Sequence, residues 1–318
     1  MNTYYQSDTR WELYNIKDKE DYCSKMLVKG RFHDQVPDDI KDAWKTVEYL
    51  LAHSFYHWQM YDEGFKKALL IIEMAVKLRA KELGMSLKTE PNKKGKVFDH
   101  KLVNIINKVF VGEHYLFLKN DIDRARKLRN HQVHSDSNTY MGGMGNIKSN
   151  LMLAVNVLNT IFQSNEHQIA LYQKSIDIAD SLRGFKNELL VLEYSKPSIL
   201  IDQVLDFKLM NNKLYLFLNP LRNNIKEILA HHYSLYPETI CLSEYEINSK
   251  EIRGISEEGC QVRIYKTSKA GNLSTHQAYL SHIENSDRSD WEICVLGLKQ
   301  NTSWKIVELE YENMSKSA

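Results

Sequence analysis

Residues 126–136 read RKLRNHQVHSD and contain the side chains of this chain that are best suited to chemistry. Arg129 is permanently charged, and its planar guanidinium group can bind two phosphate oxygens at once. His134 can exchange a proton near neutral pH, because an unperturbed imidazole has a pKa of about 6.5. Asn130 can orient the histidine or donate a hydrogen bond to a phosphate group. Together these groups predict proton transfer at a phosphate ester.

Such a set of groups is suited to cleaving RNA without a metal ion. RNA carries its own nucleophile, the 2′-hydroxyl group. An enzyme therefore needs to remove that proton, stabilise the charged phosphorane-like state and protonate the leaving 5′-oxygen. General acid–base catalysis of this kind typically contributes about 10²–10⁴-fold in rate. We expect neither a metal nor a cofactor at this site.

One unbroken helix does not direct Arg129 and His134 at the same atom. Residues five positions apart on an α-helix point about 140° away from one another, whereas Asn130 and His134, four apart, share a face. The arginine and the histidine can converge if the helix ends or turns near residues 131–135. They can also converge if two copies of the segment meet across a two-fold axis. The sequence leaves both options open.

Helical spacing of apolar residues dominates the first half of the chain. Apolar residues recur every three or four positions from about Pro37 to Tyr61 and again from about Glu63 to Leu83, which predicts two long helices. Further helices are predicted at residues 102–110, 121–130, 151–162 and 169–182. The segment MSLKTEPNKKGK contains turn formers and four lysines and predicts an exposed loop. Residues 1–37 lack a clear period, and we interpret them as an irregular lead-in.

The motif and the elements around it resemble the HEPN superfamily. The stretch Leu128, Arg129, Asn130, then His134 is similar to the R-x4–6-H signature of that superfamily, including the polar residue that often follows the arginine. The long helix YDEGFKKALLIIEMAVKLRAKELG, a polar loop, another helix, the motif and a closing helix occur in the matching order. The resemblance covers about residues 38–165. It implies a helical bundle that usually dimerises and, in many members, cleaves RNA without a metal in antiphage defence or toxin–antitoxin systems.

Two more residues are candidates for supporting roles at this site. Glu73 interrupts the apolar run LLIIEMAV, where an unpaired carboxylate is costly to bury. We therefore expect Glu73 to pair with Arg129 or Arg126, or to tune the site. His131 either complements the dipole at the end of the motif helix or assists His134.

The formal net charge of +1 gives the chain no overall positive field, so contact with RNA phosphates requires a local patch. The candidate cations come from the predicted loop and from the motif helix: Lys93, Lys94, Lys96, Arg124, Arg126 and Lys127. Such contacts would hold the RNA backbone without reading its sequence. The alternative is that these residues form ordinary solvated surface.

The second half of the chain changes to short runs rich in β-branched and aromatic residues, which predicts strands. The runs are LLVLEY, KLYLFLN, CQVRIYKT, WEICVLGL and SWKIVELEY, with one helix expected at residues 223–233. The predicted fold class is α+β, with an all-α HEPN-like bundle over residues 38–183 and a β-rich domain over residues 184–318. We expect an exposed sheet carrying Trp291 and Trp304 to sense a signal or bind a protein partner.

Other features bear on the cellular setting. The four cysteines include no C-x-x-C pair, so they predict reduced, mostly buried thiols and no zinc or redox site. The N-terminus shows no basic leader before an apolar core, and no stretch approaches the roughly 18 apolar residues of a membrane span. These features predict a cytoplasmic protein that does not interact with membranes.

The favoured hypothesis is a homodimeric endoribonuclease with a composite cleft. Arg129, Asn130 and His134 would act in that cleft, and the C-terminal domain would control when the enzyme is active. The alternative is a non-catalytic dimerisation or nucleotide-binding module that recruits a protein partner through the β-rich domain. Burial of Arg129 in an ion pair with Glu73 would favour this alternative. A metal-dependent nuclease would need clustered carboxylates, which the sequence lacks.

Overall fold

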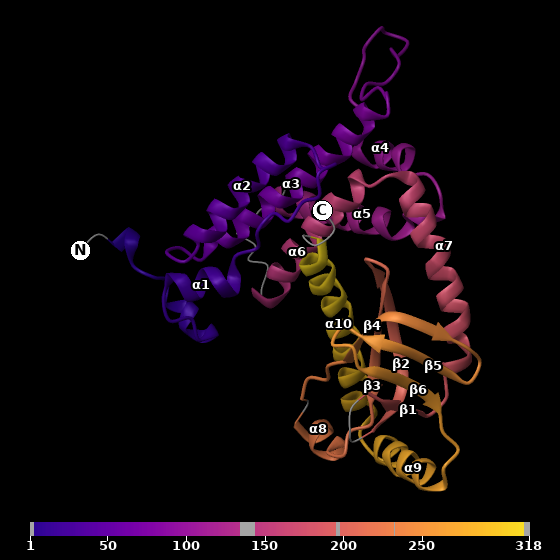
Figure 1. The fold of residues 1–318 in the computed structure, drawn as a ribbon. Helices are drawn as coiled ribbons and strands as arrows, with labels where there is room; N and C mark the ends of the chain where they lie inside the picture. Colours follow the sequence, from indigo (N-terminus) through magenta and orange to yellow (C-terminus); the bar gives the residue numbers. More distant parts are fainter. Residues whose placement is uncertain (1–2, 134–143, 195–197, 232, 315–318) are drawn as a thin grey trace. The chain divides into compact units, whose positions relative to one another are not determined.

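The computed structural model divides the chain into two compact units (Figure 1). It describes residues 3–133, 144–194, 198–231 and 233–314, and gives the backbone alone for residues 3, 131–133 and 144–146. The first unit comprises Met1–Gln168 and Glu310–Ala318, and the second comprises Ile169–Leu309. The division therefore falls near the start of helix α7 (Asn165–Leu182), whereas the sequence pattern suggested a boundary after this helix.

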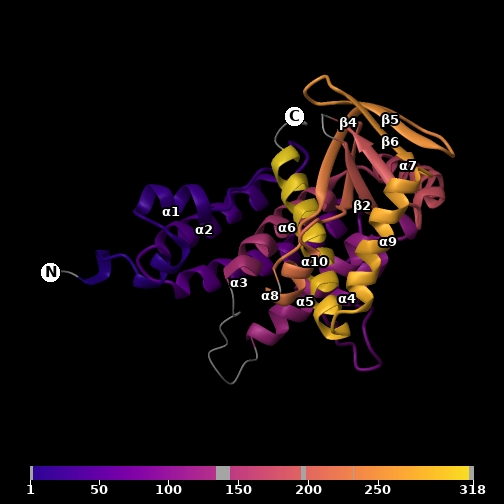
Figure 2. The same cartoon turned by 90° about the horizontal axis from the view of Figure 1, so that it is seen from below.

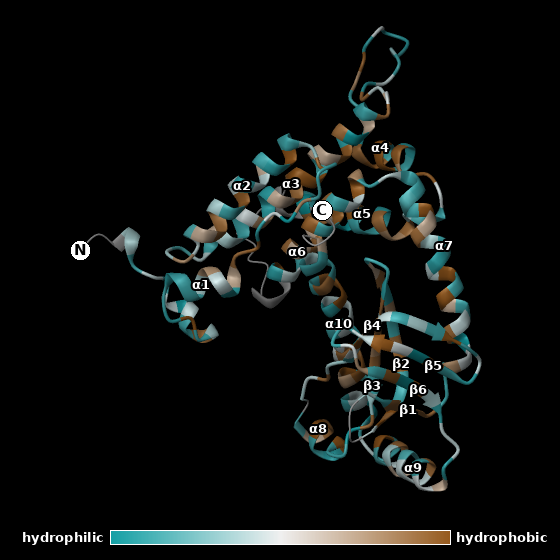
Figure 3. Ribbon diagram, in the orientation of Figure 1, coloured by the Kyte–Doolittle hydropathy of each residue, from teal (hydrophilic) through white to brown (hydrophobic). Residues whose placement is uncertain are grey.

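The first unit is helical and centres on one long helix, α3. Its elements are η1 (Thr3–Tyr5), η2 (Thr9–Tyr14), α1 (Lys19–Met26), α2 (Asp38–His53), α3 (Gln59–Glu82), α4 (Leu102–Val109), η3 (Glu113–Tyr115), α5 (Leu116–Val133) and α6 (Met144–Phe162). Helix α3 packs against α2, α4, α5 and α6. Hydrophobic and hydrophilic residues are interspersed along these helices, as expected where one face is buried (Figure 3).

The N-terminal segment contributes large side chains to the core of this unit. Trp11 and Tyr22 are almost completely buried. The indole Nε1 of Trp11 donates to the carbonyl of Ser54 at 3.0 Å, and the hydroxyl of Tyr22 donates to the carbonyl of Leu51 at 2.7 Å. Both bonds satisfy carbonyl groups at the C-terminal end of α2, where the helix has no further turn to supply N–H donors for them. The segment before residue 37 is thus fastened to the helices.

A buried asparagine of α6 joins parts of the first unit that are distant in sequence. Asn159 Nδ2 donates to the carbonyl of Arg31 at 2.8 Å, and its Oδ1 accepts from the backbone N–H of His33 at 3.0 Å. Near the C-terminus, the hydroxyl of Tyr311 donates to the carbonyl of Lys29 at 2.9 Å and accepts from its N–H at 3.0 Å. Side-chain hydrogen bonds therefore hold the backbone of residues 29–33 in place.

The second unit is built on a closed barrel of six antiparallel strands, seen from two directions in Figures 1 and 2. The strands are β1 (Leu190–Glu193), β2 (Ile199–Met210), β3 (Lys213–Pro220), β4 (Glu238–Ile247), β5 (Glu251–Ser256) and β6 (Gln261–Lys266). Each strand pairs with the next, and β6 pairs with β1 to close the barrel. Closure leaves the sheet without a first and a last strand.

Aliphatic side chains that alternate along the strands fill the barrel. The buried set is Leu190, Leu192, Ile201, Leu209, Leu214, Leu216, Leu218, Ile240, Leu242, Ile252, Val262 and Ile264. Phe185 of η4 (Arg183–Phe185) is fully buried in the same core. At Gly254 two strands approach closely, because an added Cβ would lie 2.5 Å from the carbonyl oxygen of Glu244 and 3.1 Å from the side chain of Leu242.

The predicted α+β fold class with a β-rich C-terminal domain is wrong. The strands end at Lys266, and the chain continues into α9 (Ala270–Glu284) and α10 (Arg288–Asn313). The second unit is therefore a closed six-stranded antiparallel barrel with helices, one of which, α8 (Ile225–His231), lies between β3 and β4. Both runs expected as the last strands belong to α10, so Trp291 and Trp304 lie on a helix and not on an exposed sheet.

The misassigned region shows why composition alone failed there. A short apolar run in a buried helix looks like a buried strand, because both are rich in large apolar residues. Cys294 and Leu298 of α10 are buried four residues apart and share a hydrophobic cluster with Ile228 of α8 and Tyr279 of α9. The two runs are parts of one helix of 26 residues, which neither run indicates when taken alone.

Two other expectations concern cysteines and membrane spans. All four cysteines are free, but only Cys294 is buried; Cys23 and Cys241 are half-buried and Cys260 is exposed. The expectation of mostly buried thiols is therefore wrong. In the ranges that the structure describes, no helix combines the length and the apolar character needed to cross a bilayer.

We expect Asn159→Ala to lower the free energy of unfolding by about 1–3 kcal/mol, because it leaves partly buried main-chain groups of Arg31 and His33 without the partners that Asn159 supplies. Chemical denaturation followed by tryptophan fluorescence measures the loss. Asn104→Ala, at an exposed position of α4, is the matched control and should stay within about 0.5 kcal/mol of the wild type. Equal stability of the two variants would show that the Asn159 contacts contribute little.

Gly254→Ala should destabilise the barrel by about 1–3 kcal/mol, since the new methyl group would overlap a backbone carbonyl that cannot move freely. Gly271→Ala in α9 is the control, because an added Cβ there meets no atom within 4 Å. Thermal unfolding of both variants tests the prediction. A melting temperature of Gly254→Ala equal to or above that of Gly271→Ala would contradict the close approach of β4 and β5.

Candidate functional site

The candidate site lies where α5 packs against α3 in the first unit. Arg129 of α5 forms an ion pair with Glu73 of α3 through Nη2 and Oε2. Its Nη1 donates to Oδ1 of the neighbouring Asn130 at 2.9 Å. The other carboxylate oxygen of Glu73 accepts from Nζ of Lys77 at 2.7 Å. One carboxylate therefore bridges two cations, and one guanidinium group is held by two acceptors.

Lys77 is a site residue that the sequence analysis missed. It lies four residues after Glu73 on the same helix, and a glutamate followed by a lysine at this spacing places both side chains on one face. The spacing was visible in the run EMAVK, but only the contact with Arg129 connects the pair to the motif.

Partial burial makes these interactions stronger than those of surface charges. The Glu73 side chain is 17% exposed and the Arg129 side chain 24%, whereas Lys77 is 43% exposed. Burial by itself would raise the pKa of Glu73. The hydrogen bonds from Lys77 and Arg129 outweigh burial and hold this pKa below its ordinary value of 4.5. Glu73 is therefore ionised at neutral pH and stays paired.

A hollow of about 590 Å³ opens beside this cluster. It is lined by Leu70, Glu73, Met74, Lys77, Leu78, Lys81, Leu87 and Arg129. Six of these residues recur every three or four positions along one face of α3. Three cations and one carboxylate give the lining a formal charge of +2. The hollow thus suits a ligand that combines negative charge with apolar surface.

The predicted histidines cannot be placed beside these groups. His134 lies outside the described residues, as does the side chain of His131, whose backbone belongs to α5. The structure brings Arg129, Asn130 and Glu73 together.

The predicted phosphate-binding cations of α5 are engaged with other groups. Arg126 and Lys127 both pair with Asp123, each at 2.8 Å. Hydrogen bonds from Lys127 and then Arg126 lower the pKa of Asp123, so its carboxylate stays charged. Arg124 donates to Oδ1 of Asn150 at 3.2 Å. All three side chains are thus held by contacts within the unit, and Asp123 offsets one of their three positive charges.

The predicted cations of the loop differ from those of α5. Lys93, Lys94 and Lys96 are exposed, and none of them forms an ion pair within the described part of the chain. Their charge is therefore available to an external anion. This contrast divides the six candidate cations into a paired set on α5 and an unpaired set on the loop.

We expect Glu73→Gln to lower the free energy of unfolding by about 1–3 kcal/mol at pH 7, because Arg129 loses its charged partner. The pKa of Glu73 is lower in the folded protein than in the unfolded chain. The stabilisation is thus complete above pH 4.5 and is lost as the pH falls through the lowered pKa. The difference between wild type and variant should therefore narrow below pH 4.5.

The control for this substitution is Glu63→Gln, also on α3. Glu63 pairs with Lys66 at 2.7 Å, but its side chain is 56% exposed, so we expect a loss of at most about 1 kcal/mol. Denaturation curves at several pH values give both differences. If the two variants are equally stable at pH 7, the shared carboxylate does not hold the site together.

Comparisons with protein-family models, with characterised protein sequences and with solved structures found no match for this chain. No relative therefore supplies a function. The resemblance to the HEPN superfamily stays a prediction from the motif and its surroundings.

Proposed function

We propose that the helical unit is a HEPN-type endoribonuclease module. In this proposal Arg129, Asn130 and His134 cleave RNA without a metal ion, in a cleft completed by a second copy of the chain. The single observation that supports it best is that Arg129 of the motif lines a hollow with a formal charge of +2. A fixed cation beside an accessible hollow is what binding of a phosphate group requires.

The hydrogen bonds of Arg129 leave it able to bind phosphate. A guanidinium group has five N–H donors, and Arg129 uses one on Nη1 for Asn130 and one on Nη2 for Glu73. The remaining donors can be offered to phosphate oxygens. Because the group is already oriented, it loses little freedom on binding and can stabilise the charge that develops in the transition state.

His134 would supply the proton transfer in this mechanism. One imidazole removes the proton of the 2′-hydroxyl group, which then attacks the adjacent phosphorus atom. A second imidazole, contributed by the partner copy, protonates the leaving 5′-oxygen. The products are one strand ending in a 2′,3′-cyclic phosphate and one beginning with a 5′-hydroxyl group. The two-fold arrangement also supplies two copies of Arg129 to the same phosphate.

The biological setting of the proposal follows from the resemblance alone. A cytoplasmic nuclease of this kind would act in antiphage defence or as the toxin of a toxin–antitoxin pair. The barrel unit would then control the activity by binding a protein partner, such as an antitoxin, or by sensing a signal. Fold by itself does not fix such a role.

The ion pair also favours a second candidate, a non-catalytic binding module. Arg129 is three-quarters buried and is paired with Glu73, a carboxylate that it shares with Lys77. An arginine in this state can serve packing alone, with the hollow binding a nucleotide or another phosphorylated ligand. This candidate requires no role for His134.

RNA incubated with the full chain and excess chelator should be cut, with cyclic-phosphate and 5′-hydroxyl ends. We expect His134→Ala to reduce the rate by about 10²–10⁴-fold, because general acid–base catalysis is lost. Arg129→Ala should also be strongly impaired. His53→Ala, an exposed histidine of α2, is the control and should cut like the wild type. End-labelled RNA resolved on denaturing gels gives the rates.

Regulation can keep the isolated protein inactive. The growth of cells expressing each variant is therefore measured in parallel, as a second readout of nuclease activity. The nuclease proposal fails if wild type and His134→Ala behave alike in both assays. If, in addition, a nucleotide binds to the wild type but not to Arg129→Ala, the binding module takes its place.

A further inference from the structure

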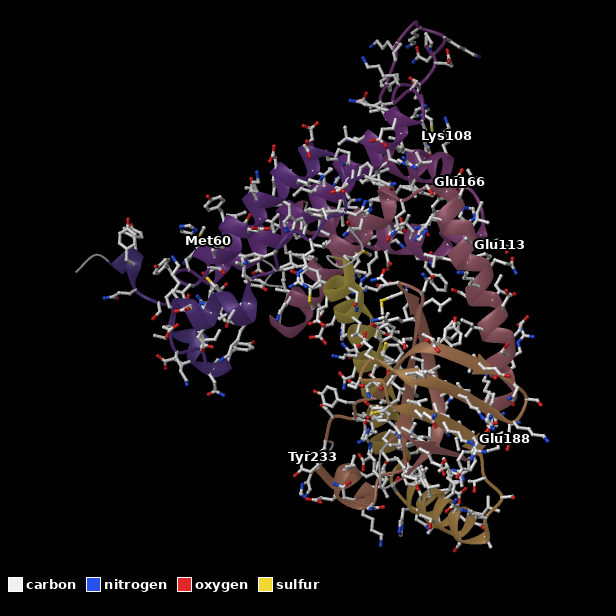
Figure 4. All side chains as sticks on the ribbon, in the orientation of Figure 1. Met60, Lys108, Glu113, Glu166, Glu188 and Tyr233 are labelled. Atoms are coloured by element: carbon white, nitrogen blue, oxygen red, sulfur yellow. The ribbon has the colours of Figure 1, made fainter. Side chains whose placement is uncertain are left out.

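Residues 85–101, between α3 and α4, form an exposed loop that folds back on itself through one isolated antiparallel bridge, Lys88 to Asp99; we call this loop the hairpin. The N–H of Thr89 donates to the carbonyl of Phe98 at 2.8 Å, and the N–H of His100 donates to the carbonyl of Leu87 at 2.8 Å. The tip is closed by the N–H of Asn92, which donates to the carbonyl of Lys96 at 2.9 Å. The hairpin projects from the helices, and its side chains extend outward beyond α4 near Lys108 (Figure 4).

The hairpin carries a concentrated positive charge. Five lysines, Lys88, Lys93, Lys94, Lys96 and Lys101, are set against Glu90 and Asp99, which gives it a formal charge of +3. All five lysines are exposed, and none forms an ion pair within the described part of the chain. In a chain with a net charge of only +1, this is a local concentration of positive charge.

Apolar side chains are exposed on the same hairpin. Phe98 is 55% exposed and Val97 is 47% exposed. Phe98 is held by its backbone, because its N–H also donates to Oγ1 of Thr89 at 3.1 Å. An aromatic ring presented among lysines on an ordered backbone is suited to stacking on a nucleic-acid base while the lysines bind phosphates.

The hairpin is continuous with the hollow beside Arg129. Leu87, at its base, lines that hollow together with Lys81 of α3. The rise of 1.5 Å per residue places Lys81 about 12 Å along α3 from Glu73, with Lys77 halfway. Lys81 is exposed, and it forms no ion pair in the described part of the chain. A row of cations therefore leads from Arg129 to the hairpin.

We propose that the hairpin of residues 85–101 and the hollow along α3 bind one continuous strand of single-stranded RNA. Lysines of the hairpin contact its phosphates and Phe98 stacks on one of its bases. This inference rests on the proposed function for the identity of the ligand as RNA. A single strand is favoured over a duplex because only unpaired bases expose a face for stacking. The hairpin thereby delivers the strand to Arg129.

The test measures binding without cleavage. Fully 2′-O-methylated, fluorescently labelled single-stranded RNA has no free 2′-hydroxyl nucleophile, so its anisotropy reports affinity alone at several salt concentrations. We expect the triple variant Lys93→Gln, Lys94→Gln, Lys96→Gln to bind on the order of ten-fold more weakly. The plot of log K against log salt should become less steep by about 2, because three phosphate contacts are lost and each contact to a single strand contributes about 0.7.

A triple variant with the same loss of charge is the control. Lys25→Gln, Lys41→Gln and Lys45→Gln remove lysines that are paired with Asp21, Asp38 and Asp42 on α1 and α2. This control should bind like the wild type with an unchanged salt slope. Phe98→Ala should weaken binding on the order of ten-fold without changing the slope, because stacking releases no counterions.

The inference is overturned if the hairpin variant and the control bind the RNA with equal affinity and equal salt slopes. It is also overturned if polyglutamate of equal length competes as well as RNA, which would indicate an acidic protein partner. Failure of the proposed function looks different: His134→Ala then cuts RNA like the wild type, whatever the hairpin variants bind. If the hairpin triple variant binds RNA weakly but still cleaves it at high RNA concentration, the result supports both the hairpin inference and the proposed nuclease function.

Discussion

The first unit depends on the carboxylate of Glu73. It lies in the middle of α3, the helix against which four others pack, and interrupts a run of apolar residues. A charge in that position is tolerated because Lys77 and Arg129 both donate to it. The same contacts fix the guanidinium group of Arg129 at the edge of the hollow. One requirement of stability, the pairing of a partly buried charge, thereby also positions the group that we propose binds phosphate.

Charge is distributed unevenly over a chain that is nearly neutral. On α5, Arg126 and Lys127 are both held by Asp123, which offsets one of their two positive charges. On the hairpin after α3, the lysines have no carboxylate partner in the described structure, and an exposed phenylalanine lies among them. Local pairing therefore decides which cations are available. Counting basic residues along the sequence could not separate the two groups, because an ion pair depends on side-chain geometry.

The barrel contrasts with the helical unit. Its interior is filled with aliphatic side chains, and its strands close on themselves, so its interior leaves little room for a ligand. The hydrogen-bonded ladder satisfies the backbone of every strand on both sides along the paired stretches. A compact scaffold of this kind is compatible with the proposed control of a catalytic unit by a partner.

The sequence by itself determined the helices of the first unit after residue 37, because apolar residues at a period of 3.6 have one stable solution, burial of one face. It also indicated that Glu73 needs a cationic partner near the motif. It did not indicate α1, which lies in the segment without a clear period. It did not determine the C-terminal half. The expected strand runs match β1, β3 and β6 but none of β2, β4 and β5, and α10 was read as two strands, since short apolar runs serve both structures. Only tertiary structure decided that the strands close into a barrel, that Lys77 joins Arg129 through one carboxylate, and that the basic loop folds back on itself as the hairpin. Barrel closure and the contact between Glu73 and Arg129 join residues that are distant along the chain, which no local pattern encodes.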